Sequence, residues 1–150
     1  MAELWRAAEP LVNRLQESTT TPLFRKIDCL SVPVPDLDAA LSFYSAHLGH
    51  ELIWRSRTAI GLRLPGSNAE LVLHSDDRPM EADLAVDSVP EALERFTSAG
   101  GTILTGPFDI QIGICAVVAD PWNNVLVILD ASKGPLHVDE NKRVIERPDS

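Results

Sequence analysis

The feature that most constrains the fold of this chain is an internal repeat that fills the middle of its 150 residues. Each copy reads as a strand, a helix and three further strands, because an alternating apolar segment precedes a helical apolar stripe and three short apolar segments follow it. A shift of 52 residues places Gly49, which ends the first stripe, on Gly101, which ends the second. A shift of 56 residues places Pro65 on Pro121 in the later part of each copy. The repeat therefore predicts an α+β fold made of two tandem β-α-β-β-β modules.

Local signals predict where the helices and strands begin and end. Asp36 is suited to cap the first helix, and Ser88 and Glu91 have the spacing of a capping box at the start of the second. Strands are expected at residues 26–34, 51–55, 58–64 and 69–74 in the first copy, and at residues 82–86, 102–104, 112–119 and 125–129 in the second.

The chain divides into three parts by composition. We expect an N-terminal helical arm with a linker, a central domain that holds the repeat and a charged C-terminal tail: residues 1–22, residues 23–133 (module one at about 24–76, module two at about 80–131) and residues 134–150. The arm carries a helical apolar stripe, so we expect it to pack on its own domain or on a sister chain. In the tail, two short apolar segments can pair around a polar turn, at residues 136–138 and 144–145.

Composition and charge exclude several classes of protein. No apolar run approaches the roughly 18–20 residues that a membrane span needs. Charged residues interrupt residues 1–16, so no signal peptide is predicted and the expected location is the cytoplasm. The net charge of −9 disfavours nucleic acid or an anionic membrane as a partner. The two cysteines, Cys29 and Cys115, lie in apolar segments and offer neither a disulfide framework nor a C-x-x-C motif.

Two segments resemble a known superfamily. Residues 32–44 read V-P-V-P-D-L-D-A-A-L-S-F-Y, and residues 119–124 read A-D-P-W-N-N. Together they resemble the vicinal oxygen chelate proteins, which include glyoxalase I, extradiol dioxygenases, methylmalonyl-CoA epimerase and the fosfomycin- and bleomycin-resistance proteins. The second segment resembles the D-P-x-G-N turn of that superfamily, with Asn123 in place of the usual glycine. The resemblance implies curled mixed sheets around a cavity, closed by two modules or by two chains, and usually a homodimer.

The resemblance also implies where a metal would be held. In the metal-dependent members, the ligands stand on the first and last strands of each module, and here those positions fall on Cys29, Leu71, Glu81 and Val127. A thiol, a carboxylate and two apolar side chains are a poor donor set for zinc, iron, nickel or manganese. His74 is an odd number of residues from Leu71, so we expect it on the face away from the cavity. We therefore expect no metal and no other cofactor.

Strand alternation from the same positions predicts which side chains line the cavity. The expected ligand-binding set joins apolar side chains, two carboxyls and a tryptophan–arginine pair of a β-hairpin: Cys29, Ser31, Leu71, Leu73, Glu81, Asp83, Val127, Leu129, Trp54 and Arg55. Two alternatives stay open. An arginine such as Arg55, Arg57 or Arg63 can pair with the carboxyls, and Cys29 can be a small buried side chain. The loop at residues 106–113 is long enough to cover the mouth of the cavity.

Three functions fit this pattern. An apolar trough with few polar groups favours a metal-independent small-molecule-binding protein that resembles the bleomycin-resistance proteins and sequesters an apolar ligand, cationic if the carboxyls are its partners. A second hypothesis is a glyoxalase-like lyase or isomerase with an atypical metal site of Cys29 and Glu81, in which Glu81 is the general base. A third is a catalytically inactive regulatory or partner-binding module. The expected partners are a small-molecule ligand and a second copy of the chain, with no nucleic acid and no membrane.

Overall fold

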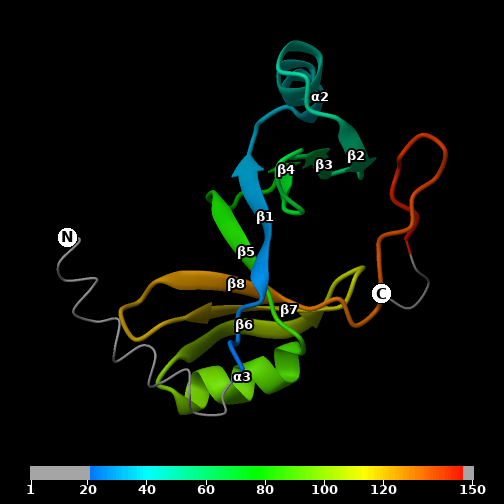
Figure 1. Ribbon diagram of the computed structural model, residues 1–150. Helices are drawn as coiled ribbons and strands as arrows, with labels where there is room; N and C mark the ends of the chain where they lie inside the picture. The colour runs from blue at the N-terminus through cyan, green and yellow to red at the C-terminus, as the bar shows by residue number, and fades with distance from the viewer. Residues whose placement is uncertain (1–20, 147–150) are drawn as a thin grey trace.

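The computed structural model describes residues 21–146, and both predicted modules are present in it (Figure 1). Module one contains β1 (Lys26–Pro33), α2 (Leu37–Leu41), the π-helical η1 (Ser42–His47), β2 (Leu52–Arg55), β3 (Ala59–Arg63) and β4 (Glu70–His74). Module two contains β5 (Glu81–Ala85), α3 (Val89–Ser98), β6 (Thr102–Asp109), β7 (Ile114–Ala119) and β8 (Val125–Leu129). The α+β fold is confirmed. The predicted N-terminal arm falls almost wholly on residues outside the described part.

Both helices begin at the predicted caps. The Asp36 side chain accepts a hydrogen bond from the backbone N–H of Ala39 at 3.1 Å, and the Ser88 hydroxyl accepts one from Glu91 at 3.4 Å. Each accepted bond satisfies a backbone donor that has no partner within the helix. The first helix differs from expectation in its second half, where the chain widens into η1. There the N–H of Leu48 donates to the carbonyl of Phe43 at 3.1 Å, five residues back.

The two modules share one eight-stranded mixed sheet, in the order β2-β3-β4-β1-β5-β8-β7-β6. The modules join at its centre, where β1 and β5 pair antiparallel. Within each module the first and last strands pair parallel, β1 with β4 and β5 with β8. The sheet curls without closing into a barrel, and in Figure 1 β2, β3 and β4 lie across an open space from β6, β7 and β8.

Each helix covers the outer face of its own module. The core clusters are Ala40, Ile60, Leu62 and Leu73 under α2, and Val86, Val89, Ala92, Leu93, Ala116, Val118 and Ile128 under α3. Fully burying one such aliphatic side chain contributes about 1.5–3 kcal/mol. Because both cores form on the outer faces, the inner faces of the sheet stay available for a site.

One buried carboxylate links the end of β8 to the start of α3. Asp130 is buried, and it accepts hydrogen bonds from the backbone N–H groups of Val89 at 2.8 Å and Ile114 at 3.0 Å. Burial opposes ionisation of this side chain, but the hydrogen bonds from Val89, Ser132 and Ile114 outweigh it and lower the pKa of Asp130. Asp130 therefore fixes the second helix as an anionic cap.

The tail forms the predicted hairpin and adds to the free edge of β2. Val138 and Val144 form an antiparallel bridge, and Arg55 of β2 pairs in parallel with Arg143. The N–H of Arg55 donates to the carbonyl of Lys142 at 2.8 Å, and the N–H of Val144 donates to the carbonyl of Arg55 at 2.8 Å. In Figure 1 the tail, in orange and red, runs from the end of β8 to the side of β2. The tail thus bridges the two modules.

Within residues 21–146, no helix has the length and apolar content required to cross a bilayer.

Candidate functional site

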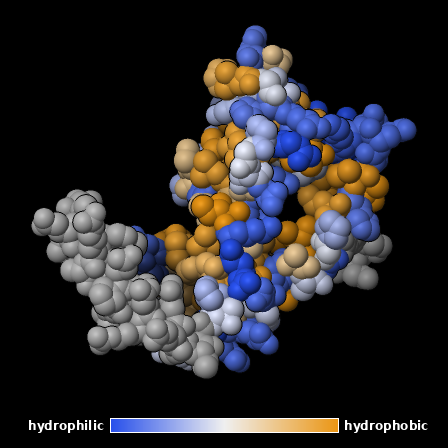
Figure 2. Space-filling view, in the orientation of Figure 1, coloured by the Kyte–Doolittle hydropathy of each residue, from blue (hydrophilic) through white to orange (hydrophobic). Residues whose placement is uncertain are grey.

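The inner face of module two encloses a pocket of about 900 Å³. Its walls are the apolar inner sides of β6, β7 and β8, together with the segment that leads into β5: Arg78, Pro79, Met80, Glu81, Ala82, Asp83, Thr105, Phe108, Ile110, Cys115, Val117, Val125, Leu126, Val127 and Leu129. Figure 2 shows a hollow between the upper and lower parts of the molecule, with apolar side chains at its border. Four of the predicted site residues line this pocket: Glu81, Asp83, Val127 and Leu129. We call it the acid-pair pocket after Glu81 and Asp83.

Two carboxyls of β5 provide the polar groups of the acid-pair pocket. Glu81 and Asp83 are two residues apart on one strand and therefore project from the same face. Glu81 Oε2 and Asp83 Oδ1 are buried, and no donor among residues 21–146 reaches either atom. The pKa of Asp83 is raised to about 7, first by burial and then by the hydrogen bond and the negative charge of Glu81. Near pH 7 Asp83 is therefore about half protonated, and in the protonated form its proton is shared with Glu81.

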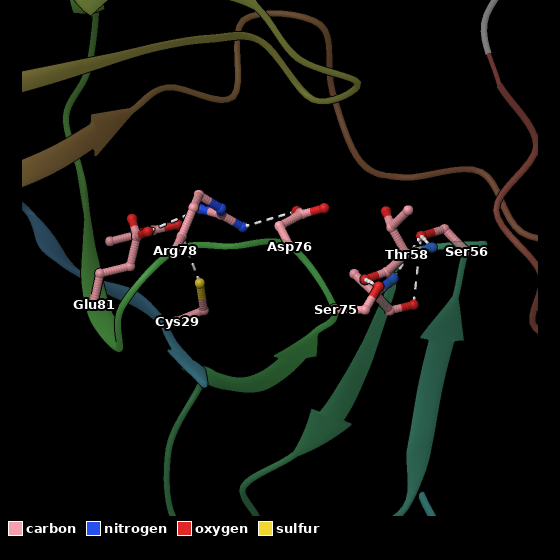
Figure 3. A network of polar contacts seen from close by, with 9 residues as sticks. Cys29, Ser56, Thr58, Ser75, Asp76, Arg78 and Glu81 are labelled. Carbon is pink, nitrogen blue, oxygen red and sulfur yellow. Dashed lines mark hydrogen bonds and ion pairs between the residues drawn. The ribbon is translucent and has the colours of Figure 1, made fainter. Parts of the chain in front are cut away.

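The cation beside this pair is Arg78, which the sequence analysis missed. Its Nη1 donates to Glu81 Oε1 at 2.8 Å and its Nη2 to Asp76 Oδ2 at 3.4 Å. Figure 3 shows Arg78 lying between Glu81 and Asp76, on the segment that connects β4 to β5. Two of the three arginines considered from the sequence have other partners, since Arg55 pairs with Asp38 at 3.3 Å and Arg63 with Glu51 at 2.8 Å.

Cys29 lies beside the acid pair but does not line the pocket. Its Sγ donates to Asp83 Oδ2 at 3.4 Å. Burial, followed by the negative charge of Asp83, raises the pKa of the Cys29 thiol far above its ordinary value. Without a metal the thiol therefore stays protonated, which disfavours a role as a nucleophile. Ser31, also predicted in the site, is buried on β1 and likewise does not line the pocket.

The expectation that Leu71 and Leu73 line the cavity is wrong. Leu73 is fully buried in the core under α2, and Leu71 packs against that core. The reason is a shift in register between the two modules. Ser31 pairs with Val72 and Asp83 with Val127, so the last strands correspond at a separation of 55 residues rather than 56. A change of one residue turns every side chain of a strand to the other face.

The corrected register brings other polar side chains of β4 to the inner face. Glu70 and His74 alternate with the buried leucines, so the expectation that His74 faces away from the cavity is wrong. Glu70 Oε1 accepts a hydrogen bond from the indole Nε1 of Trp54 at 2.7 Å. Burial raises the pKa of Glu70 against the opposing effect of that bond. Trp54 and Arg55 thus lie on module one, away from the acid-pair pocket.

The inner face does not fit the metal that the fold family uses. Of the four family positions only Glu81 offers a carboxyl and Cys29 a thiol, because the register correction moves the Leu71 position to Val72, and neither Val72 nor Val127 has a donor atom. Within residues 21–146, no three or more side chains of His, Cys, Asp or Glu are grouped so that they could hold an ion. Zinc, iron and manganese sites in proteins need at least three such ligands.

Comparison with known proteins agrees with the architecture. The family model of the Glyoxalase/Bleomycin resistance protein/Dioxygenase superfamily matches residues 26–128. Methylmalonyl-CoA epimerase from Mycobacterium tuberculosis is 18% identical, with a TM-score of 0.64 over 79% of this chain and 95% of that chain. The Mn(II)-bound glyoxalase from Novosphingobium aromaticivorans is 20% identical, with a TM-score of 0.56 over 75% of this chain and 41% of that chain.

A third similar structure is homoprotocatechuate 2,3-dioxygenase from Brevibacterium fuscum, 19% identical, with a TM-score of 0.56 over 87% of this chain and 40% of that chain. No curated protein matches the chain. At such identities the likeness to solved structures shows the fold alone. Because the family model matches well over half of the sequence, the chain belongs to the Glyoxalase/Bleomycin resistance protein/Dioxygenase superfamily.

Proposed function

We propose that this protein binds an apolar small molecule that carries a positive charge, without a metal, in the acid-pair pocket. The observation that supports this proposal is the pair of buried carboxyl oxygens, Glu81 Oε2 and Asp83 Oδ1, which no donor among residues 21–146 reaches when both carboxyls are ionised. A buried carboxylate is costly unless a donor or a cation accompanies it. A cationic ligand supplies that partner, and sequestration of such a ligand is the simplest use of the site.

The apolar walls provide the second part of the recognition. Val127 and Leu129 of β8, the strand that pairs with β5, and Phe108 of β6 line the pocket with apolar side chains. A volume of about 900 Å³ lies in the range of about 300–1,000 Å³ that is typical of small-molecule sites. The ligand we propose therefore has an apolar body of drug size and one ammonium-like group directed at β5.

Arg78 gives the site a counter-ion when no ligand is bound. Its guanidinium neutralises one oxygen of Glu81 from the pocket rim, and its side chain is about half exposed. Because the Arg78 side chain is about half exposed, water screens its side of this ion pair. A ligand cation can therefore compete with Arg78 for Glu81 at little cost, while Asp83 gives up its proton.

One observation favours a second candidate, an isomerase or lyase that moves protons. A carboxyl with a pKa of about 7, as Asp83 has, is suited to accept and return a proton at neutral pH. In this reading Asp83 and Glu81 share the acid and base roles, and Arg78 binds an anionic group of the substrate. This candidate predicts that the protein turns over a substrate with an acidic C–H bond, whereas a sequestering protein shows no turnover.

Calorimetric titration with phenyltrimethylammonium, its neutral isostere tert-butylbenzene and the anion benzoate tests the proposal. We expect the cation to bind at least about tenfold more tightly than the isostere, which is about 1.4 kcal/mol. Asp83→Asn should remove this preference. Asp87→Asn, which changes an exposed carboxylate outside the pocket, is the matched control. Equal binding of the cation and the isostere, or tighter binding of benzoate, would contradict the proposal.

A further inference from the structure

A second pocket, of about 850 Å³, lies between the two modules on the side of β2. Module one supplies Trp54, Ser56, Thr58 and Ala59, and the turn between β6 and β7 supplies Asp109, Ile110 and Gln111. The remaining wall consists of Leu136, Val144 and Glu146 of the tail. We call it the tail pocket. It shares only Ile110 with the acid-pair pocket, so it is a neighbouring but separate space.

The tail is fixed in place as a wall. Besides the two backbone bonds to Arg55, the Nζ of Lys142 donates to the carbonyl of Leu52 at 2.7 Å and lies 3.9 Å from Glu51. The turn of the hairpin is held by Asp139, whose Oδ1 accepts from the N–H of Asn141 at 2.8 Å and of Arg143 at 3.0 Å. These bonds span the hairpin and the edge strand, so the tail holds its three lining residues against module one.

One side of the tail pocket presents an aromatic ring in a set orientation. The Trp54 indole rests on the backbone of β3 at Gly61, where a Cβ atom would overlap the ring. Its N–H is directed at Glu70. Contact with Gly61 and the bond to Glu70 together hold the plane of the ring. A flat aromatic ligand can stack against such a ring, because the faces of the ligand and of the indole are apolar and the quadrupoles of the two rings favour an offset stack.

The charges at the tail pocket are acidic. Asp109 is neutralised by Lys133, whose Nζ lies 3.0 Å away. Glu146, on the tail, adds a second carboxylate at the exposed rim. Arg55, which was predicted to bind the ligand, is directed at Asp38 instead. Within residues 21–146, the residues that line this pocket include no lysine or arginine.

We propose that the tail pocket is a second binding site, for a planar aromatic cation that stacks on Trp54 and is attracted by Glu146. The tail supplies one wall of this site, so the site is incomplete without the tail. The proposal does not depend on the acid-pair pocket, because no carboxyl of β5 takes part.

Fluorescence titration with the planar cation proflavine tests the tail pocket. A chain that ends at Lys133 lacks the tail wall and should bind proflavine at least about tenfold more weakly than the full chain. Glu146→Lys reverses the charge at an exposed position and should weaken binding about fivefold or more in low salt. Glu140→Lys makes the same charge change elsewhere on the tail and should leave the affinity within about twofold, since Glu140 does not line the pocket.

Two further arms separate this proposal from the first. Because proflavine is itself an apolar cation, it is titrated with an excess of phenyltrimethylammonium present to occupy the acid-pair pocket. Under this condition dye binding should persist, and Asp83→Asn should leave it unchanged. Unchanged binding to the shortened chain, or equal effects of Glu146→Lys and Glu140→Lys, would overturn the proposal, as would loss of dye binding in Asp83→Asn. If the shortened chain does not fold, as judged by circular dichroism, Glu146→Lys and Glu140→Lys decide the matter alone, because both positions are exposed.

Discussion

Binding of a permanent cation in the acid-pair pocket should tighten as the pH rises, because only the ionised form of Asp83 attracts it. The pKa of Asp83 is about 7, so the carboxyl is about 1% ionised at pH 5 and about 90% ionised at pH 8. If the cation binds the ionised form alone, the apparent dissociation constant falls by roughly 90-fold between those two values, which is about 2.7 kcal/mol. Phenyltrimethylammonium is the suitable ligand, since its charge does not change with pH.

Isothermal titration calorimetry between pH 5 and pH 8 measures this change. Titration at pH 6 in buffers of different ionisation enthalpy should also detect release of close to one proton for each cation bound, because about 90% of Asp83 is then protonated. Asp83→Asn should remove both effects, whereas Asp87→Asn should keep them. An affinity that is constant or falls with rising pH would refute the reasoning, as would a pH dependence that survives in Asp83→Asn.

Three predictions concern stability. Asp83→Asn should raise the free energy of unfolding by about 1–3 kcal/mol at pH 8 and by less at pH 5. The raised pKa makes the cost of Asp83 accumulate as the pH rises from about 4, where Asp ionises in the unfolded chain, to about 7, where it ionises in the fold; urea denaturation that shows no gain at pH 8 would contradict this. Asp130→Asn should lower the free energy of unfolding by about 1.5–3 kcal/mol at pH 7. The loss should shrink at acid pH, where Asp130 of the unmutated protein becomes protonated, and an equal loss at every pH would argue against the anionic cap. Leu73→Ala should lower the free energy of unfolding by about 2–5 kcal/mol and Val72→Ala by less than half of that, since only Leu73 is fully buried under α2. The reverse order of the urea midpoints would instead support the strand register expected from the sequence.

Much of the fold could be predicted because local signals and the repeat agree. Asp36 and Ser88 are both caps in the structure, and the duplicated pattern corresponds to the two modules. On β8, Val127 and Leu129 line the pocket, and the turn around Asn123 directly before that strand gives a local reference for its alternation. No comparable motif lies next to β4, so the family position there was assigned to Leu71, one residue from Val72, and alternation gave the wrong face for Leu71 and Leu73.

The remaining site features depend on contacts between distant parts of the chain. Arg78 meets Glu81 only because the segment before β5 folds over the start of that strand, and a polar loop residue gives no periodic signal. The tail hairpin was predicted, but its pairing with β2 was not, since a strand added to an edge has no fixed distance in sequence from its partner. The burial that raises the pKa of Asp83 likewise follows from packing around it rather than from its neighbours in sequence.

The central claim is that paired carboxyls, rather than a metal, bind the ligand in this pocket. Its most direct test is the metal content of protein purified without chelators, measured by inductively coupled plasma mass spectrometry. The account predicts zinc, nickel, iron and manganese each far below one ion per chain, with the same values in Glu81→Ala. About one ion of any of these metals per chain, lost in Glu81→Ala, would contradict it.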